Sequence, residues 1–135
     1  MIKLIIPGEP KGKARPRMST KTGRAYTPEQ TVQYENWVKT CYTLSETRDK
    51  LEGTIKAEIK AYMSIPKSTS KKKRQEMLEG KIRPTKKPDV DNMAKIILDS
   101  LNKLAFDDDK QVVDCSIEKW YGEEPRVELV LEEIR

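Results

Sequence analysis

The stretch Gly53-Thr-Ile-Lys-Ala-Glu-Ile-Lys-Ala-Tyr-Met63 alternates between apolar and polar residues. A period of two places the apolar side chains on one side of an extended chain, which is typical of a strand with one buried face. Such a strand needs an apolar layer packed against that face. The stretch therefore predicts a sheet covered on one side by amphipathic helices.

Three further segments are predicted to be strands. Ile2–Ile6 is a short apolar run that ends at Pro7 and Gly8, which favour a turn. Gln111–Tyr121 and Arg126–Ile134 also alternate, and a short turn-forming segment separates them. We expect these last two segments to form an antiparallel hairpin that closes the sheet.

Helix signals lie between the predicted strands. Thr27 suits an N-cap and Pro28 the first helical position, so a helix is expected from there to about Leu44. Its apolar face is predicted to contain Val32, Trp37, Val38 and Cys41, with Tyr34 and Tyr42 at its flank. A short helix over Ser68–Glu79 and a third helix from about Asp91 to Lys103 follow, the third with an apolar stripe through Met93, Ile97, Leu101 and Leu104.

The chain of 135 residues fits one domain spanning residues 1–135. The order of the predicted elements indicates an α+β fold with a mixed or antiparallel sheet of about four strands and helices packed on one face. The apolar fraction is only 36%, so an interface between two copies could add burial. No apolar run approaches the length of a membrane span, and no signal peptide is visible, so we expect a cytoplasmic protein without a membrane partner.

Charge is unevenly distributed along the chain. Residues 1–24 contain seven basic residues and one acid, and residues 67–95 contain ten basic residues and four acids. Residues 118–135 instead contain six acids and three bases. This asymmetry indicates a positive face for a polyanion such as nucleic acid, with a solvated surface as the alternative.

The sequence contains no histidine and only two cysteines, Cys41 and Cys115. The absence of histidine excludes Ser-His-Asp and Cys-His chemistry and histidine-bound metals. Two isolated thiols form neither a zinc site nor a disulfide scaffold, so both are predicted to be small core residues of a reduced protein. Catalysis would have to depend on carboxylates, lysine, arginine, tyrosine or a metal ion.

Two carboxylates precede the third helix, in Lys86-Lys87-Pro88-Asp89-Val90-Asp91-Asn92. If the segment is extended, Asp89 and Asp91 leave on the same side; if Asp91 caps the helix, both still lie at its positive N-terminus. Mg²⁺ takes one or two carboxylates together with waters and phosphate oxygens. The pair therefore predicts a magnesium site, and an ordinary helix cap is the alternative.

A second acidic group, Asp107-Asp108-Asp109, follows the same helix. The helix between the two groups is roughly 18 Å long, so Asp109 can reach Asp89 and Asp91 only through a turn of its loop or from a second subunit. Lys95 lies one helical turn beyond Asp91 and could stabilise charge on a phosphate. The alternatives are a solvated turn for the acids and a surface salt bridge for Lys95.

These residues resemble the signature of the RusA family of Holliday junction resolvases. The resemblance covers most of the chain and is carried by residues 7–10, Lys13, residues 15–17, Tyr26, residues 87–92, Lys95, residues 99–102 and residues 106–114. Where some members have a basic residue directly before the first aspartate, this chain has Pro88, and Lys86 or Lys87 can supply that charge.

The resemblance implies a homodimeric endodeoxyribonuclease, bacterial or encoded by a phage or prophage, that resolves four-way DNA junctions in recombination and repair. It implies Mg²⁺ as cofactor, for which Mn²⁺ can substitute, and no small-molecule cofactor. By position it assigns Asp89, Asp91 and Asp109 as metal-binding catalytic carboxylates and Lys95 as the catalytic lysine. It also implies that Asp109 does reach the first pair.

We therefore expect hydrolysis by paired symmetric nicks that leave a 5′-phosphate and a 3′-hydroxyl. Tyr26 is expected in the core or an interface, with stacking on a base as the alternative. The expected phosphate contacts are Lys11, Lys13, Arg15, Arg17, Lys71, Lys72, Lys73, Arg74, Lys86 and Lys87. Rival functions are a nuclease of flaps or forks and a non-catalytic DNA-binding protein. A Ca²⁺ module at Asp107–Asp109 lacks the expected glycine-containing loop.

Overall fold

The computed structural model describes residues 1–45 and 49–134. The strands are β1 (Ile2–Pro7), β2 (Arg17–Met18), β3 (Ala25–Tyr26), β4 (Ile55–Ser64), β5 (Val112–Gly122) and β6 (Arg126–Glu133). The helices are α1 (Glu29–Ser45), α2 (Lys71–Leu78), α3 (Val90–Leu101) and the short 3-10 helix η1 (Asp109–Gln111).

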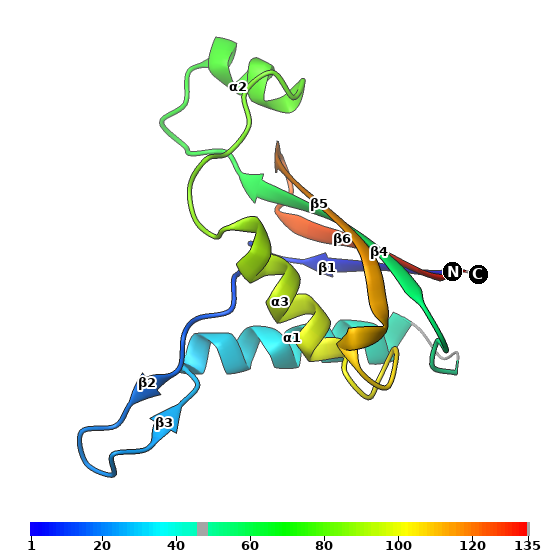
Figure 1. The fold of residues 1–135 in the computed structure, drawn as a ribbon. Coiled ribbons are helices and arrows are strands. Elements are labelled where there is room, and N and C mark those ends of the chain that lie inside the picture. Colours follow the sequence, from blue (N-terminus) through cyan, green and yellow to red (C-terminus); the bar gives the residue numbers. More distant parts are fainter. Residues whose placement is uncertain (46–48, 135) are drawn as a thin grey trace.

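The main sheet is mixed and has the strand order β1-β6-β4-β5 (Figure 1). Strand β6 is antiparallel to both β1 and β4, whereas β4 and β5 are parallel. The strand predicted over residues 53–63 is confirmed, because its five inward residues, Ile55, Ala57, Ile59, Ala61 and Met63, are all buried. The predicted α+β class with a sheet of about four strands is therefore correct.

The predicted hairpin between the last two strands is wrong. Strand β4 lies between β5 and β6, so the strands that follow each other in the sequence are not paired. Strand β6 instead pairs with β1 and β4, and its inward residues, Val127, Leu129 and Leu131, are at most 1% exposed. Strand β5 forms the other edge of the sheet and is exposed from Val113 to Ser116, with Val113 59% exposed.

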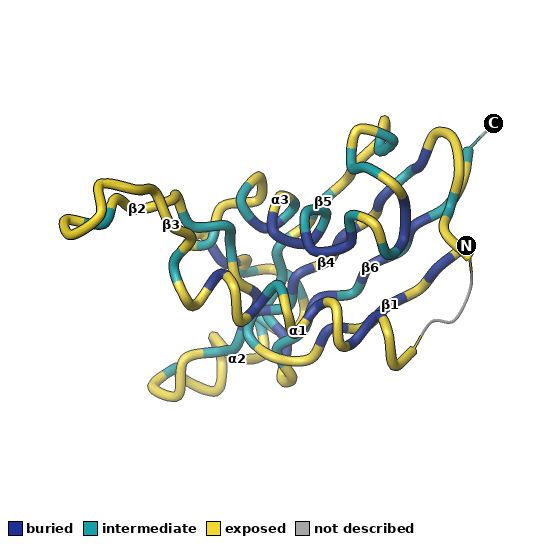
Figure 2. The backbone as a smooth tube through the Cα atoms, turned by 90° about the horizontal axis from the view of Figure 1, so that it is seen from below, coloured by how far each residue is buried: buried dark blue, intermediate teal, exposed yellow. Residues whose placement is uncertain are grey.

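Helices α1 and α3 lie side by side and pack on the sheet (Figure 1). Figure 2 shows that the buried parts of the chain lie where these helices and the strands meet. The predicted stripe of α3 is confirmed, since Met93, Ile97 and Leu101 are fully buried. The predicted face of α1 is partly wrong, because Val32 and Trp37 are 41% and 42% exposed.

The exposure of Trp37 on α1 is explained by a hydrogen bond. The Trp37 indole N–H donates to the carbonyl oxygen of Pro7 at 2.7 Å, so its ring lies over the end of β1 rather than in the core. Of the two cysteines, Cys41 is buried as predicted, but Cys115 is exposed on β5. The prediction for Cys115 is wrong, because Cys115 lies in the part of β5, from Val113 to Ser116, that is left uncovered.

Helix α2 does not belong to the helical layer, contrary to the prediction of helices on one face. It lies beyond the end of the sheet and contacts β5 (Figure 1). The predicted helix is present, and the Ser70 hydroxyl caps it by accepting from the Lys73 backbone N–H. The following segment packs onto β5, where the Arg83 guanidinium lies 3.7 Å from the centre of the Trp120 ring.

The segment between Pro10 and Pro28 contains a short ribbon. Strands β2 and β3 pair in antiparallel fashion and project from the body of the molecule (Figure 1). Residues 10–28, which we call the basic arm, contain six cationic residues and no acid: Lys11, Lys13, Arg15, Arg17, Lys21 and Arg24. Tyr26 lies on this ribbon and is 49% exposed, so it is not a core residue, and its place in an interface or against a base stays a prediction.

Among the described helices, none has the length and apolarity needed to cross a membrane.

Candidate active site

The first acidic pair lies at the start of α3. Asp89 occupies the N-cap with an extended backbone, at φ −71° and ψ 154°, and Asp91 lies in the first helical turn. The Asp89 side chain makes no capping hydrogen bond, so its oxygens are not used to hold the helix end. Both carboxylates are exposed beside the positive end of the helix dipole, which stabilises negative charge.

Lys95 and Asp99 continue the face of α3 that begins at Asp91, because four residues make about one helical turn. Lys95 is exposed, and its ammonium has no ion pair within the described part of the chain. The surface salt bridge considered for Lys95 is therefore not formed. Asp99 is partly buried and binds a different lysine, Lys13, at 3.3 Å.

The three aspartates of the second acidic group have different surroundings. Asp107 is 75% exposed and binds Lys50 at 3.1 Å. The Asp108 carboxylate accepts from the Lys110 backbone N–H at 2.9 Å and caps η1, which holds the pKa of Asp108 below its usual value. These two residues therefore behave as parts of a structured turn.

Asp109 turns toward α3, but it meets the helix at Asp99. Burial raises the pKa of Asp109, and the neighbouring carboxylates of Asp99 and Asp108 raise it further. Asp99 lies eight residues, or about 12 Å along the axis, beyond Asp91. Within residues 1–45 and 49–134, no three Asp, Glu, Cys or His side chains gather closely enough to hold one metal ion.

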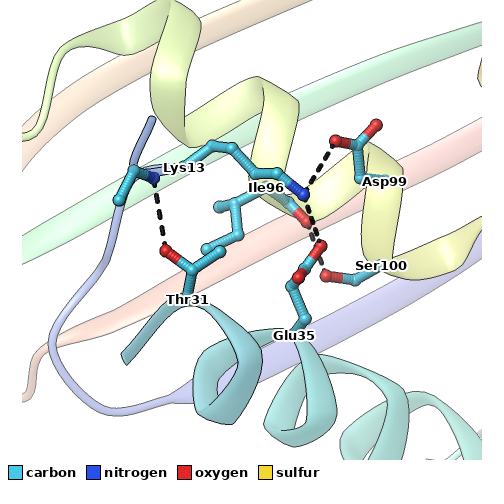
Figure 3. A network of polar contacts seen from close by, with 7 residues as sticks. Lys13, Thr31, Glu35, Ile96, Asp99 and Ser100 are labelled. Atoms are coloured by element: carbon cyan, nitrogen blue, oxygen red, sulfur yellow. Dashed lines mark hydrogen bonds and ion pairs between the residues drawn. The ribbon is translucent and has the colours of Figure 1, made fainter. Parts of the chain in front are cut away.

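A partly buried ion-pair network, absent from the sequence-based prediction, lies between the basic arm, α1 and α3. The Lys13 ammonium is 3.0 Å from a Glu35 carboxylate oxygen and 3.3 Å from one of Asp99 (Figure 3). Burial lowers the pKa of Lys13, but the two carboxylates outweigh it and leave that pKa above its usual value. The four-residue spacing of Asp99 from Lys95 was a signal for Asp99, but nothing in the sequence singled out Glu35.

A cleft of about 920 Å³ opens beside the start of α3. One wall is the basic arm, and the other is the segment from Lys86 to Asn92. Its charged lining residues are Glu9, Lys11, Lys13, Arg15, Arg17, Glu29, Lys86, Lys87 and Asp89. The structure therefore brings six of the expected phosphate contacts to the cleft that contains Asp89.

The remaining expected phosphate contacts, Lys71, Lys72, Lys73 and Arg74, lie on α2. All four are exposed, and Arg74 is 3.8 Å from Glu123. They lie outside the cleft, at the end of the sheet (Figure 1). A DNA molecule that contacted both regions would have to extend along this side of the protein.

The arm approaches α3 very closely at Gly12. A Cβ atom on Gly12 would lie 2.8 Å from Cβ of Pro88 and 3.1 Å from Cβ of Asn92. We expect Gly12→Ala to lower the free energy of unfolding by about 1–3 kcal/mol, because the added methyl forces the arm or the helix start to move. Urea denaturation would measure the loss, and an unchanged midpoint would show that the arm is not fixed there.

The residues at the start of α3 fit a magnesium ion. Asp89 and Asp91 are hard oxygen donors, and Asp89 has no capping bond to give up. Mg²⁺ needs no more than one or two protein carboxylates when waters and phosphate oxygens complete its coordination. Asp109 would join them only after its loop moves or from a second subunit.

Sequence comparison identifies the same family that the motif residues resemble. The sequence profile of the family described as "Endodeoxyribonuclease RusA" matches residues 7–132. A protein of Bacillus subtilis (strain 168) with the name "Uncharacterized protein YqaN" is 38% identical over 137 residues, and the match covers 98% of this chain and 96% of the relative. The chain belongs to the RusA family of endodeoxyribonucleases.

Proposed function

We propose that the protein resolves four-way DNA junctions by Mg²⁺-dependent hydrolysis, acting as a homodimer in recombination and repair. The observation that supports this most directly is the cleft beside α3, where a cationic arm faces the helix start that contains Asp89. Bare carboxylates on a phosphate-binding surface repel the substrate. A divalent cation held by Asp89 and Asp91 would offset that repulsion.

Each group in the proposed site has a separate role. Asp89 and Asp91, together with Asp109, would hold Mg²⁺, or Mn²⁺ in its place. A metal ion held by these residues would supply an activated water and offset charge on the phosphate. Lys95 is free to contact the phosphate or stabilise charge that develops on it, because no carboxylate of the described residues occupies its ammonium.

The homodimer follows from the symmetry of the substrate. A four-way junction has two equivalent strands to cut, and a two-fold dimer presents two sites with the same symmetry. Paired nicks that leave 5′-phosphate and 3′-hydroxyl ends are the expected product. A second subunit also offers a route by which Asp109 could reach the start of α3, which it does not reach within one chain.

The direct test uses a synthetic four-way junction labelled on each strand. The purified protein is incubated with it with and without Mg²⁺, and the products are read on a sequencing gel beside matched flaps, forks and linear duplex. We expect symmetric cuts near the branch point that disappear with chelator. Preferred cutting of flaps or forks would replace the junction assignment, and binding without metal-dependent cutting would contradict the nuclease.

The basic arm should supply salt-dependent affinity. Arg15 and Arg17 are exposed and have no ion pair in the described structure, so each can neutralise one phosphate. We expect Arg15→Gln and Arg17→Gln each to reduce the slope of log affinity against log salt by about 0.9. Fluorescence anisotropy from 50 to 300 mM salt would measure it, and an unchanged slope would remove that residue from the interface.

A further inference from the structure

Lys13 differs from the other cations of the basic arm. Its side chain is only 23% exposed, and the carboxylates that bind it are 17% exposed for Glu35 and 26% exposed for Asp99. The Lys13 side chain is therefore partly buried, and its ammonium lies between α1 and α3 (Figure 3). Lys11, two residues earlier, is exposed and has no such partners among the described residues.

The backbone around Lys13 is fixed to the same two helices. The Lys13 N–H donates to the carbonyl oxygen of Asn92 at 2.9 Å, one residue after Asp91. The Ala14 N–H donates to the Thr31 hydroxyl at 3.3 Å, and Gly12 lies against Pro88. Three consecutive residues thus attach the arm to α1 and to the first turn of α3.

We propose that Lys13 is a positioning residue of the nuclease site, not a phosphate contact. Its side chain joins α1 to the C-terminal part of α3, and its backbone holds the helix start that contains Asp89 and Asp91. This inference rests on the proposed nuclease function. The contacts that support it, however, are present in the protein without DNA.

A phosphate contact by Lys13 would be costly for this arrangement. To reach solvent, the ammonium would have to leave Glu35 and Asp99, and two partly buried carboxylates would lose their common cation. The Asp109 carboxyl also lies next to Asp99. The Lys13 ammonium therefore allows the carboxylates of Glu35 and Asp99 to lie close together where α1 packs on α3.

The test compares Lys13→Met with Lys11→Met, which removes the same charge from the same arm. Lys11→Met should reduce the salt slope of junction binding by about 0.9. Lys60→Met, on the sheet face turned away from the helices, should leave the single-turnover cleavage rate at saturating protein unchanged. Lys13→Met should leave the slope unchanged and lower that saturating rate at least about tenfold, because small displacements of reacting groups cost up to about 10²-fold. The reverse pattern would overturn the proposal.

Amide hydrogen exchange gives a readout that needs neither DNA nor activity. In Lys13→Met, the amide of residue 13 and that of Met93, which donates to Asp89, should exchange about tenfold faster than in the wild type. Lys11→Met should not change them. If the wild type cuts no branched DNA, the proposed function fails, whereas unchanged exchange in Lys13→Met rejects the positioning role alone.

A second variant covers the case in which Lys13→Met does not fold. Glu35→Gln leaves the Lys13–Asp99 pair in place and alters only the α1 side of the network. We expect a saturating rate about threefold to tenfold lower, with an unchanged salt slope and exchange faster at residue 13 than in the wild type. A wild-type rate and wild-type exchange in this variant would also contradict the proposal.

Discussion

Asp109→Asn should lower the rate of junction cleavage by at least about 10³-fold while leaving junction affinity within about twofold, since a lost metal ligand removes several kcal/mol of transition-state stabilisation. The side chain keeps its size, so the turn before β5 should persist. The measurement is a single-turnover time course at saturating protein, together with a binding titration in Ca²⁺ to suppress cleavage.

The matched control is Asp107→Asn in the same turn. Asp107 is 75% exposed and binds only Lys50 among the described side chains, so its loss should change the cleavage rate less than about twofold. If Asp109→Asn cleaves like the wild type, Asp109 is not part of the site. If Asp107→Asn is equally defective, the acidic turn acts through its fold and not through one carboxylate.

Mixing two inactive variants tests which subunit supplies Asp109. In one chain Asp109 meets α3 at Asp99, about 12 Å along the helix from Asp91. If Asp109 comes from the partner subunit, an Asp91→Asn subunit paired with an Asp109→Asn subunit has one intact site and nicks one strand. If both acids come from one chain, every site in the mixed dimer is damaged. We expect the mixed dimers to nick DNA, which is the result for an Asp109 supplied by the partner subunit.

The fold could be predicted from the sequence where one local pattern determines it. The alternation from Ile55 to Met63 assigns one face of β4 to the core whatever its neighbours are. Strand order is different, because alternation says which face is buried and not which strand lies alongside. Leu129 on β6 is buried and Val113 on β5 is exposed, and only the packed sheet distinguishes these two strands.

The residues of the site also divide into those that a local sequence pattern locates and those that only the tertiary structure locates. Asp89 and Asp91 were located from Pro88 and the onset of the helical pattern, which are adjacent in the sequence. The Lys13 network joins residues 22 positions apart for Glu35, and still further apart for Asp99. In sequence Lys13 is one of six cations in an arm without acids, so only the tertiary structure separates it from the others.

Lys95→Met is the second change expected to have a large effect, a loss of about 10²-fold in the saturating single-turnover rate. Lys95 lies one helical turn from Asp91, is exposed, and lacks a carboxylate partner in the part of the chain that the structure describes. Because no carboxylate of the described residues pairs with it, the Lys95 ammonium can act on the phosphate without first breaking an ion pair. Junction affinity should fall by less than about threefold, because the arm supplies most phosphate contacts.

Two comparisons separate this role from simple phosphate binding. Lys60→Met makes the same charge change on the sheet face turned away from the helices, and it should leave the rate unchanged. If Lys95 only binds a phosphate, Lys95→Met will have a smaller salt slope and a wild-type rate at saturating protein. A lower rate with an unchanged salt slope would mean that the Lys95 ammonium acts in the transition state. Lys95→Arg then shows whether any cation is sufficient at this position or whether the compact ammonium is needed.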